Sequence, residues 1–163
     1  MNDTVITMEG LTRLTEELDR LKTVGREAAA ERLAEAAAGD PNPAENADYR
    51  DAREEQALLE RRIALLEERL LAAHLVEPCP GNGRVDVGER VRVRDLDSRE
   101  VLEIELVGPF EADASAGRIS VASPLGRAIV GLRRGEVTGF DAPGGRRRFE
   151  VVAVEPPAPA ALR

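Results

Sequence analysis

The stretch Met8–Leu21, MEGLTRLTEELDRL, repeats leucine at Leu11, Leu14, Leu18 and Leu21. The 3-4-3 spacing is typical of a helix that packs along one seam against a partner helix. Thr7 comes directly before this stretch and is expected to cap the helix. After Val24 the seam becomes rich in alanine, which lets two helices approach closely. These alanines are Ala28, Ala29, Ala30, Ala34 and Ala36–Ala38.

A second seam follows with steps of 4-3-4-3-4-3. Its members are Ala52, Gln56, Leu59, Ile63, Leu66, Leu70 and Ala73. Both seams have small residues near residues 39–52 and large residues at the other end. Folding the chain back at residues 39–43 therefore sets large against large and small against small. The pattern predicts an antiparallel hairpin of two helices, each about 30 residues and about 45 Å long.

The turn between these helices has its own signals. Gly39 is expected to end the first helix in the left-handed conformation. Asn42 is expected to cap the second helix, with Pro43 at its first position and Glu45 at its third.

The pattern changes after residue 76. Residues 77–83, EPCPGNG, read as a linker, and alternation with period two then begins. Four or five strands are expected, with a short helix over residues 125–132, which predicts a small antiparallel β domain. The predicted class is α+β: a hairpin at 1–76, a linker at 77–83, a β domain at 84–155 and a disordered tail at 156–163.

Charge is distributed unevenly along the chain. Residues 1–75 contain 17 acidic and 10 basic residues, a net charge of −7 within the total of −8. A protein that binds nucleic acid by neutralising phosphates would show the opposite balance. The excess acid indicates either a solvated helix surface or an element that seeks a basic cavity or a divalent cation.

The chain offers little for a metal or membrane site of its own. A single cysteine, Cys79, and a single histidine, His74, cannot form a disulfide or a zinc site of the usual kind. No run of about 18 apolar residues and no signal peptide are seen, so no membrane contact and a cytoplasmic protein are expected.

Two motifs carry a family resemblance. Residues 45–49, ENADY, follow Gly39-Asp40 and resemble the tip motif Gly-Asp-x-x-Glu-Asn-Ala-(Glu/Asp)-Tyr of the GreA/GreB transcript-cleavage factors. Residues 119–128, ISVASPLGRA, are similar to that family's segment Ile-Ser-x-x-Ser-Pro-x-x-Arg-Ala. The resemblance spans residues 5–155. It implies that the β domain is FKBP-like.

The resemblance also implies a function. Such factors insert the hairpin into the secondary channel of a backtracked RNA polymerase, and the polymerase then cleaves the RNA 3′ end. Asp40 and Glu45 would be the catalytic carboxylates that share a Mg²⁺ with the polymerase active site, with Asp48 as a helper. The factor has no cofactor of its own and is an accessory protein, not an enzyme.

Further roles follow from the same resemblance. Asn46, Tyr49, Arg50 and Arg53 are expected to contact RNA or polymerase, and Ser123 and Pro124 to dock on the polymerase surface. Tyr49 as a packing residue behind the tip is the alternative. The expected partners are core RNA polymerase and the RNA 3′ end, bound by a monomer.

One departure from the family pattern bears on function. The family's acidic pair lies three residues apart, whereas Asp40 and Glu45 lie five apart, with Pro41-Asn42-Pro43-Ala44 between them. A carboxylate displaced by 1 Å can cost orders of magnitude in rate. The alternative function is therefore a channel-binding regulator or inhibitor that does not stimulate cleavage.

Two alternatives from other classes remain. A prolyl isomerase needs an aromatic-lined pocket, and the β half contains only Phe110, Phe140 and Phe149 as aromatic residues. A coiled-coil adaptor that does not contact polymerase would explain the hairpin alone.

Overall fold

The computed structural model describes residues 4–39, 46–77 and 82–156. Contacts divide the chain into two compact units. We call Thr12–Ala72 the hairpin unit, and Met1–Leu11 together with Ala73–Arg163 the C-terminal unit.

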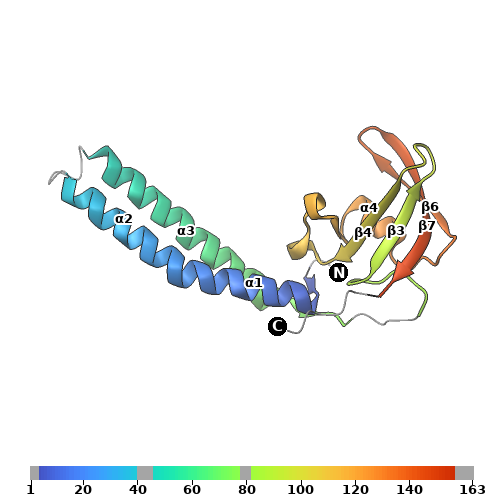
Figure 1. The fold of residues 1–163 in the computed structure, drawn as a ribbon, viewed down its shortest axis with the longest axis horizontal. Coiled ribbons are helices and arrows are strands. Elements are labelled where there is room, and N and C mark those ends of the chain that lie inside the picture. The colour runs from blue at the N-terminus through green and yellow to red at the C-terminus, as the bar shows by residue number, and fades with distance from the viewer. Residues whose placement is uncertain (1–3, 40–45, 78–81, 157–163) are drawn as a thin grey trace. The chain divides into compact units, whose positions relative to one another are not determined.

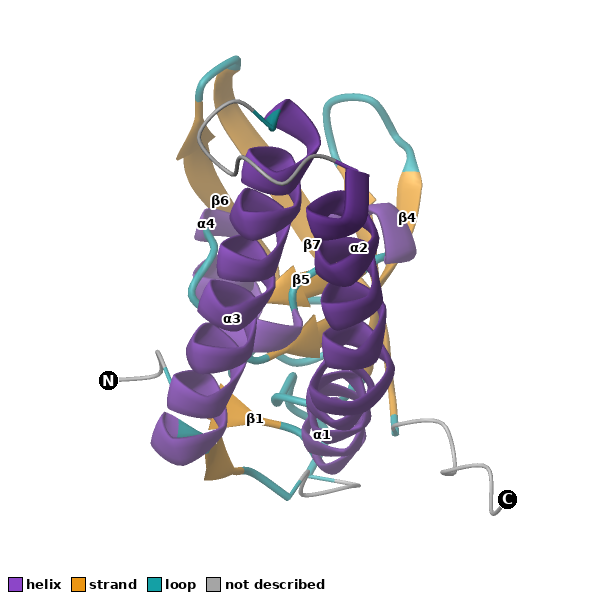
Figure 2. Ribbon diagram, turned by 90° about the vertical axis from the view of Figure 1, so that its left-hand side faces the viewer, coloured by secondary structure: helices purple, strands orange, loops and turns teal. Residues whose placement is uncertain are grey.

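The hairpin unit confirms the predicted pair of helices (Figures 1 and 2). The first helix consists of α1 (Met8–Arg20), a π-helical turn η1 (Leu21–Gly25) and α2 (Arg26–Gly39). The backbone stays right-handed and helical at Arg20 and Arg26, on both sides of η1, so the helix continues through the turn. The returning helix is α3 (Ala47–Ala72).

The predicted seams are largely confirmed. In the first helix Leu14 and Leu18 are buried, and all seven predicted positions of the second seam are buried or half-buried. The prediction for the alanine-rich part of the first seam includes too many residues. Ala28, Ala30, Ala34, Ala37 and Ala38 are exposed, while Ala29, Leu33 and Ala36 are half-buried. One helix face can turn only about every fourth residue toward a partner, so a run of alanines cannot all lie in the seam.

Two predicted caps at the turn need correction. Gly39 is the last residue of α2 and does not adopt the left-handed conformation. The described part of the returning helix begins at Ala47, and Asn46 caps it. The residue first predicted for that role, Asn42, lies outside the described residues.

The C-terminal unit contains a five-stranded sheet in the order β5-β4-β3-β7-β6. Its strands are β3 (Arg90–Asp95), β4 (Val101–Val107), β5 (Arg118–Ser120), β6 (Val137–Ala142) and β7 (Gly145–Glu155). All neighbours pair antiparallel except β4 and β5, which are parallel. The predicted class of a helical hairpin with a small β domain is therefore confirmed.

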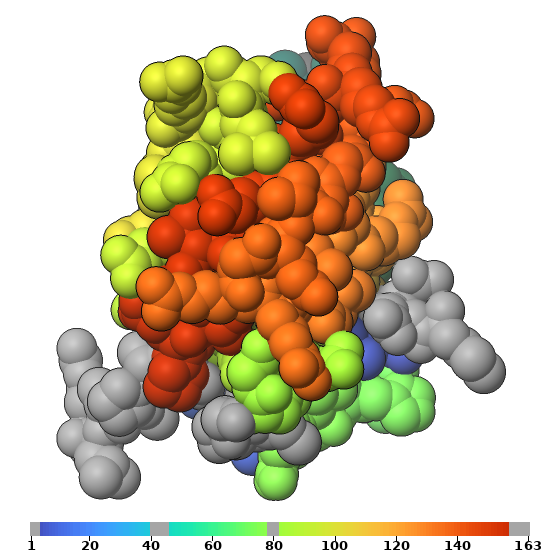
Figure 3. Space-filling view, turned by 90° about the vertical axis from the view of Figure 1, so that its right-hand side faces the viewer, coloured from blue at the N-terminus to red at the C-terminus, as the bar shows by residue number. Residues whose placement is uncertain are grey.

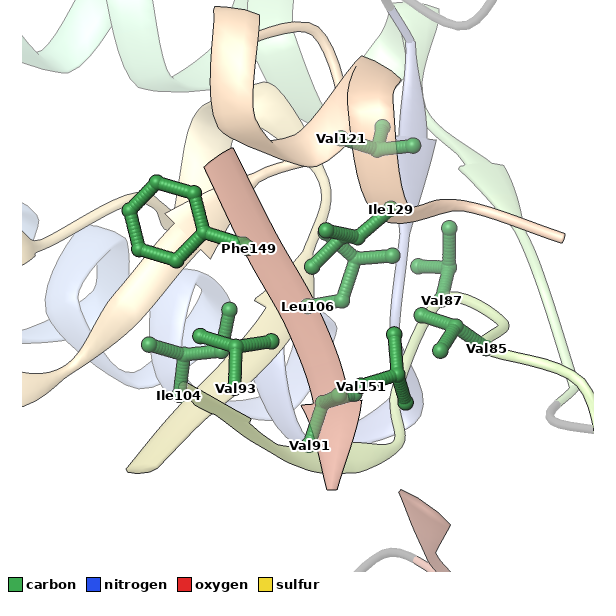
Figure 4. Close-up of a cluster of buried hydrophobic side chains, with 10 residues drawn as sticks. All are labelled: Val85, Val87, Val91, Val93, Ile104, Leu106, Val121, Ile129, Phe149 and Val151. Carbon is green, nitrogen blue, oxygen red and sulfur yellow. The ribbon is translucent and has the colours of Figure 1, made fainter. Parts of the chain in front are cut away.

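The core of this unit comes from alternation along the strands. In β3, Val91 and Val93 are buried while Arg90, Arg92 and Arg94 are exposed. The buried side chains of β3, β4 and β7 converge with Ile129 of the short helix α4 (Pro124–Ile129), as Figure 4 shows. Val85 and Val87 also lie in this core, although they belong to none of the named strands. Atoms of β6 and β7 occupy much of one face of the unit (Figure 3, orange to red).

The start of the chain belongs to the C-terminal unit. Strand β1 (Val5–Ile6) pairs in parallel with β2 (His74–Leu75), the segment that follows α3. Two short 3-10 turns, η2 (Pro109–Glu111) and η3 (Ala114–Ala116), complete the unit. Among the described residues, no helix is long and apolar enough to cross a membrane.

Candidate functional site

The end of the hairpin is closed by one buried side chain, Asn46. Its Oδ1 accepts the backbone N–H of Tyr49 at 2.9 Å, which caps α3. Its Nδ2 donates to the carbonyl of Ala36 at 2.8 Å, in the last turn of α2. This one side-chain amide thus accepts an N–H group that α3 leaves free and donates to a carbonyl that α2 leaves free. The Asn46 side chain thus ties the last turn of α2 to the first turn of α3.

The two predicted catalytic carboxylates, Asp40 and Glu45, lie outside the described residues, so their Mg²⁺ site stays a prediction. Within the described part of the chain no cluster of three or more acidic, histidine or cysteine residues could hold a metal ion. The predicted helper, Asp48, is exposed in the first turn of α3. A carboxylate is favoured there by the helix dipole.

The predicted contact residues of the tip fall into two groups. Arg50 and Arg53 are exposed and three residues apart, so they lie on one face of α3. Tyr49 is half-buried and precedes the buried Ala52 by three residues, which places it on the seam. The packing role considered for Tyr49 fits this position. Whether Asn46, Tyr49, Arg50 and Arg53 touch RNA or polymerase stays a prediction.

Several other cations of the hairpin form ion pairs within it. Ion pairs cross from one helix to the other at Lys22–Glu67 (2.6 Å), Arg26–Glu60 (2.8 Å) and Arg32–Glu55 (3.4 Å). Arg26 holds both oxygens of Glu60, and this hydrogen bond lowers the pKa of the Glu60 carboxyl. By contrast, neither Arg50 nor Arg53 forms an ion pair with any described residue. They are the cations near the tip that a partner could engage.

The second predicted site is the turn before α4. Ser123 caps α4 because its Oγ accepts the N–H of Gly126 at 3.0 Å, and Pro124 occupies the first helical position. Gly126 is required here, since a Cβ would lie 2.1 Å from the carbonyl oxygen of Ser120. Ser123 is half-buried and Pro124 is exposed.

A shallow cavity of about 390 Å³ opens beside this turn. Ser123, Pro124 and Leu125 line one side of it, and Phe140 and Pro143 another. Phe140 stacks on Phe149 at 5.7 Å between ring centroids, so the buried Phe149 holds the more exposed ring in place. The predicted docking residues thus lie at an apolar hollow with a rigid aromatic wall.

Sequence reasoning missed two groups of residues. The bond from Asn46 to Ala36 could not be read from the motif, although the spacing of Asn46 and Tyr49 is that of an N-cap and its partner. Glu111 was also missed. It is a buried carboxylate that binds Thr7, 104 residues away, and no local pattern signals such a contact.

Two family models together cover almost the whole chain. The model described as "Transcription elongation factor, N-terminal" matches residues 4–75. The model described as "Transcription elongation factor, GreA/GreB, C-term" matches residues 80–156.

The curated relatives of the chain carry the same family name as these models. The chain is 44% identical to transcription elongation factor GreA of Methylococcus capsulatus, over 94% of this chain and 98% of the relative. It is 42% identical to transcription elongation factor GreA of Ralstonia nicotianae, over 95% of this chain and 99% of the relative. Among solved structures, GreA factor homolog 1 of Thermus thermophilus is 34% identical, covering 94% of this chain and 99% of that chain, with a TM-score of 0.41.

The family match covers both units, and the tip and Ser-Pro motifs lie where the hairpin end and the α4 turn have been described. On these grounds the chain belongs to the GreA/GreB family and is a transcription elongation factor.

Proposed function

We propose that this factor binds core RNA polymerase as a monomer and stimulates cleavage of backtracked RNA through its hairpin tip. The observation that carries the proposal is the bridge from Asn46 to Ala36. It ties the last turn of α2 to the start of α3, and the acidic residues Asp40 and Glu45 fall between these two points in the sequence. Arg50 and Arg53 follow in the first turns of α3, exposed and without ion pairs among the described residues.

The chemistry suits a carboxylate brought from outside. Two-metal hydrolysis of a phosphodiester needs a second divalent ion to activate water and stabilise the leaving oxygen. Mg²⁺ is commonly held by one or two carboxylates together with water and phosphate oxygens. Asp40 and Glu45 would complete the coordination of such an ion, with the RNA 3′ end held by Arg50 or Arg53.

A cleavage assay tests this proposal. A stalled, backtracked elongation complex is incubated with Mg²⁺ and the factor, and release of 3′ RNA fragments is followed. The wild-type factor should accelerate release, and Asp40→Asn and Glu45→Gln should each reduce the acceleration at least about tenfold. Asp51→Asn, which changes an exposed acid near the start of α3, is the matched control and should act like the wild type.

The spacing of the acidic pair favours one alternative. If the wild-type factor binds the complex and slows nucleotide addition without releasing fragments, the chain is a channel-binding regulator that does not support cleavage. Prolines at positions 41 and 43, between the two acids, are the feature that makes this alternative specific.

The docking part of the proposal has its own test. We place the polymerase contact at the hollow beside Ser123 and Pro124, because it joins an exposed apolar turn to an anchored aromatic ring. Pro124→Glu should weaken binding to core polymerase at least about tenfold, which is about 1.4 kcal/mol. Val101→Glu, another exposed apolar residue of the C-terminal unit, should leave binding unchanged. Equal effects of the two variants would place the contact elsewhere.

A further inference from the structure

Glu111 is a buried carboxylate to which the start of the chain is bound. It is 5% exposed, and its Oε2 accepts the backbone N–H of Thr7 at 2.9 Å and that of Gly108 at 3.1 Å. Its Oε1 accepts the hydroxyl of Thr7. Thr7, Gly108 and Glu111 all belong to the C-terminal unit, and Thr7 directly precedes α1.

The hydroxyl of Thr7 connects the carboxylate to the helix. It accepts the N–H of Gly10 at 3.0 Å while it donates to Glu111. A free N–H of the first turn of α1 is thus joined through the cap to a negative charge, which the N-terminal end of a helix favours. A buried carboxylate is costly unless it is well hydrogen-bonded, and here the start of α1 supplies those bonds.

Two glycines leave room for this arrangement. A Cβ on Gly10 would lie 1.9 Å from Oε1 of Glu111, and a Cβ on Gly108 would lie 1.8 Å from the carbonyl oxygen of Val5. Glycine inside a helix costs about 1 kcal/mol relative to alanine. Gly10 is therefore explained by the carboxylate that packs against it, and α1 is built to start on Glu111.

The chain that leaves the hairpin returns to the same segment. His74 donates its N–H to the carbonyl of Thr4 at 2.6 Å, and Val76 donates to that of Ile6 at 2.9 Å. The segment Thr4–Thr7 is thus held by β2 and by Glu111 together.

We propose that Glu111 is a positioning residue, which fixes the first turn of α1 on the C-terminal unit so that a docked factor delivers its tip productively. This inference rests on the proposed function. Glu111 acts through Thr7 and does not touch the reacting groups. Its loss should impair delivery of the tip while docking is kept.

Steady-state cleavage separates delivery from docking. The maximal cleavage rate reports delivery of the tip, and the factor concentration at half-maximal rate reports docking. Glu111→Gln removes the negative charge and turns an NH2 group toward the Thr7 hydroxyl, which then loses its acceptor. Thr7→Val removes the hydroxyl with little change in shape. Both variants should lower the maximal rate at least about tenfold, with the half-maximal concentration changed less than about twofold.

Matched controls keep a general loss of structure apart from this effect. Thr7→Ser retains the hydroxyl and should restore the maximal rate. Glu103→Gln removes an exposed carboxylate of β4 and should act like the wild type. In the full-length Thr7→Val variant, amide hydrogen exchange should be faster at residue 7 and at Gly10 than in the wild type, and unchanged in the strands of the sheet.

Several results would overturn the proposal. An unchanged maximal rate in Thr7→Val with faster exchange would show that the contact is structural only. A raised half-maximal concentration at an unchanged maximal rate would show that Glu111 serves docking. If the wild-type factor does not stimulate cleavage, the proposed function itself fails. The maximal effect and the half-maximal concentration are then measured on the slowing of nucleotide addition. A wild-type factor that neither stimulates cleavage nor slows nucleotide addition refutes both proposals.

Discussion

Asp95 shows how a single buried charge ties two strands and a turn together. It is 1% exposed, and its Oδ1 accepts the backbone N–H groups of Asp97 and Ser98 at 2.8 and 3.1 Å. Its Oδ2 accepts the guanidinium of Arg147, with Nε at 3.0 Å. The bond from Arg147, followed by the two backbone bonds, lowers the pKa of the Asp95 carboxyl below its ordinary 3.8. The folded state therefore prefers Asp95 ionised.

This preference predicts a pH-dependent stability. Because the folded pKa is depressed, the contribution of Asp95 is present above pH 3.8 and is lost as the pH falls through the folded value. Asp95→Asn should lower the free energy of unfolding clearly at pH 7, and by less at pH 3. Urea unfolding followed by circular dichroism measures both. Asp97→Asn, the exposed neighbour, is the control, and an equal loss at both pH values in Asp95→Asn would contradict the assignment.

At the scale of elements, the seams of the two hairpin helices differ in length by one residue. Seven buried or half-buried seam positions span 23 residues from Leu14 to Ala36, and seven span 22 residues from Tyr49 to Leu70. The first set is Leu14, Leu18, Leu21, Gly25, Ala29, Leu33 and Ala36. The extra residue falls where the helix turns π-helical, at Leu21–Gly25, since a π turn takes up one residue without rotating the helix beyond it. Gly25 lets this turn approach Leu59, whose Cδ1 would lie 3.2 Å from an added Cβ.

This mismatch predicts that a deletion in one helix is tolerated and a deletion in the other is not. Removing Thr23 should let η1 become ordinary α-helix, with a melting temperature equal to or above that of the wild type. Removing Arg61 should turn the rest of the α3 seam by about 100° and cost about 2 kcal/mol or more in lost burial. Thermal unfolding at 222 nm compares the two. If both deletions destabilise equally, η1 does not store the extra residue.

At the scale of the whole molecule, the division into two units predicts separable stabilities. The chain has one tyrosine and no tryptophan, so Tyr49 fluorescence reports on the hairpin unit alone. Ile63 is buried in the hairpin and Ile129 in the C-terminal core. Truncating either to alanine should cost about 2–5 kcal/mol in its own unit. Ile63→Ala should lower the denaturation midpoint seen by Tyr49, whereas Ile129→Ala should leave it unchanged. A shift in both variants would show that the units unfold together.

The sequence by itself determined the features that depend on local period and local chemistry. The helix seams, the strand alternation, the cap at Thr7 and the two family motifs all come from residues within a few positions of one another. The edge strand β6 was not singled out, because Val137–Ala142 carries only a weak alternation. The alanine run after Val24 was read too broadly, because alanine fits a seam and a solvent face equally well.

The tertiary structure decided the contacts between residues far apart in the chain. Asn46 reaches Ala36 across the hairpin, Arg147 reaches Asp95 from the neighbouring strand, and Glu111 binds Thr7, which lies 104 residues away in the sequence. Each of these polar groups could equally have faced water, which is where a lone Asn, Asp or Glu is normally found. Only the folded chain shows which of them are buried and therefore need a partner. That need is met by Ala36 for Asn46 and by Thr7 for Glu111, two partners that no local pattern indicates.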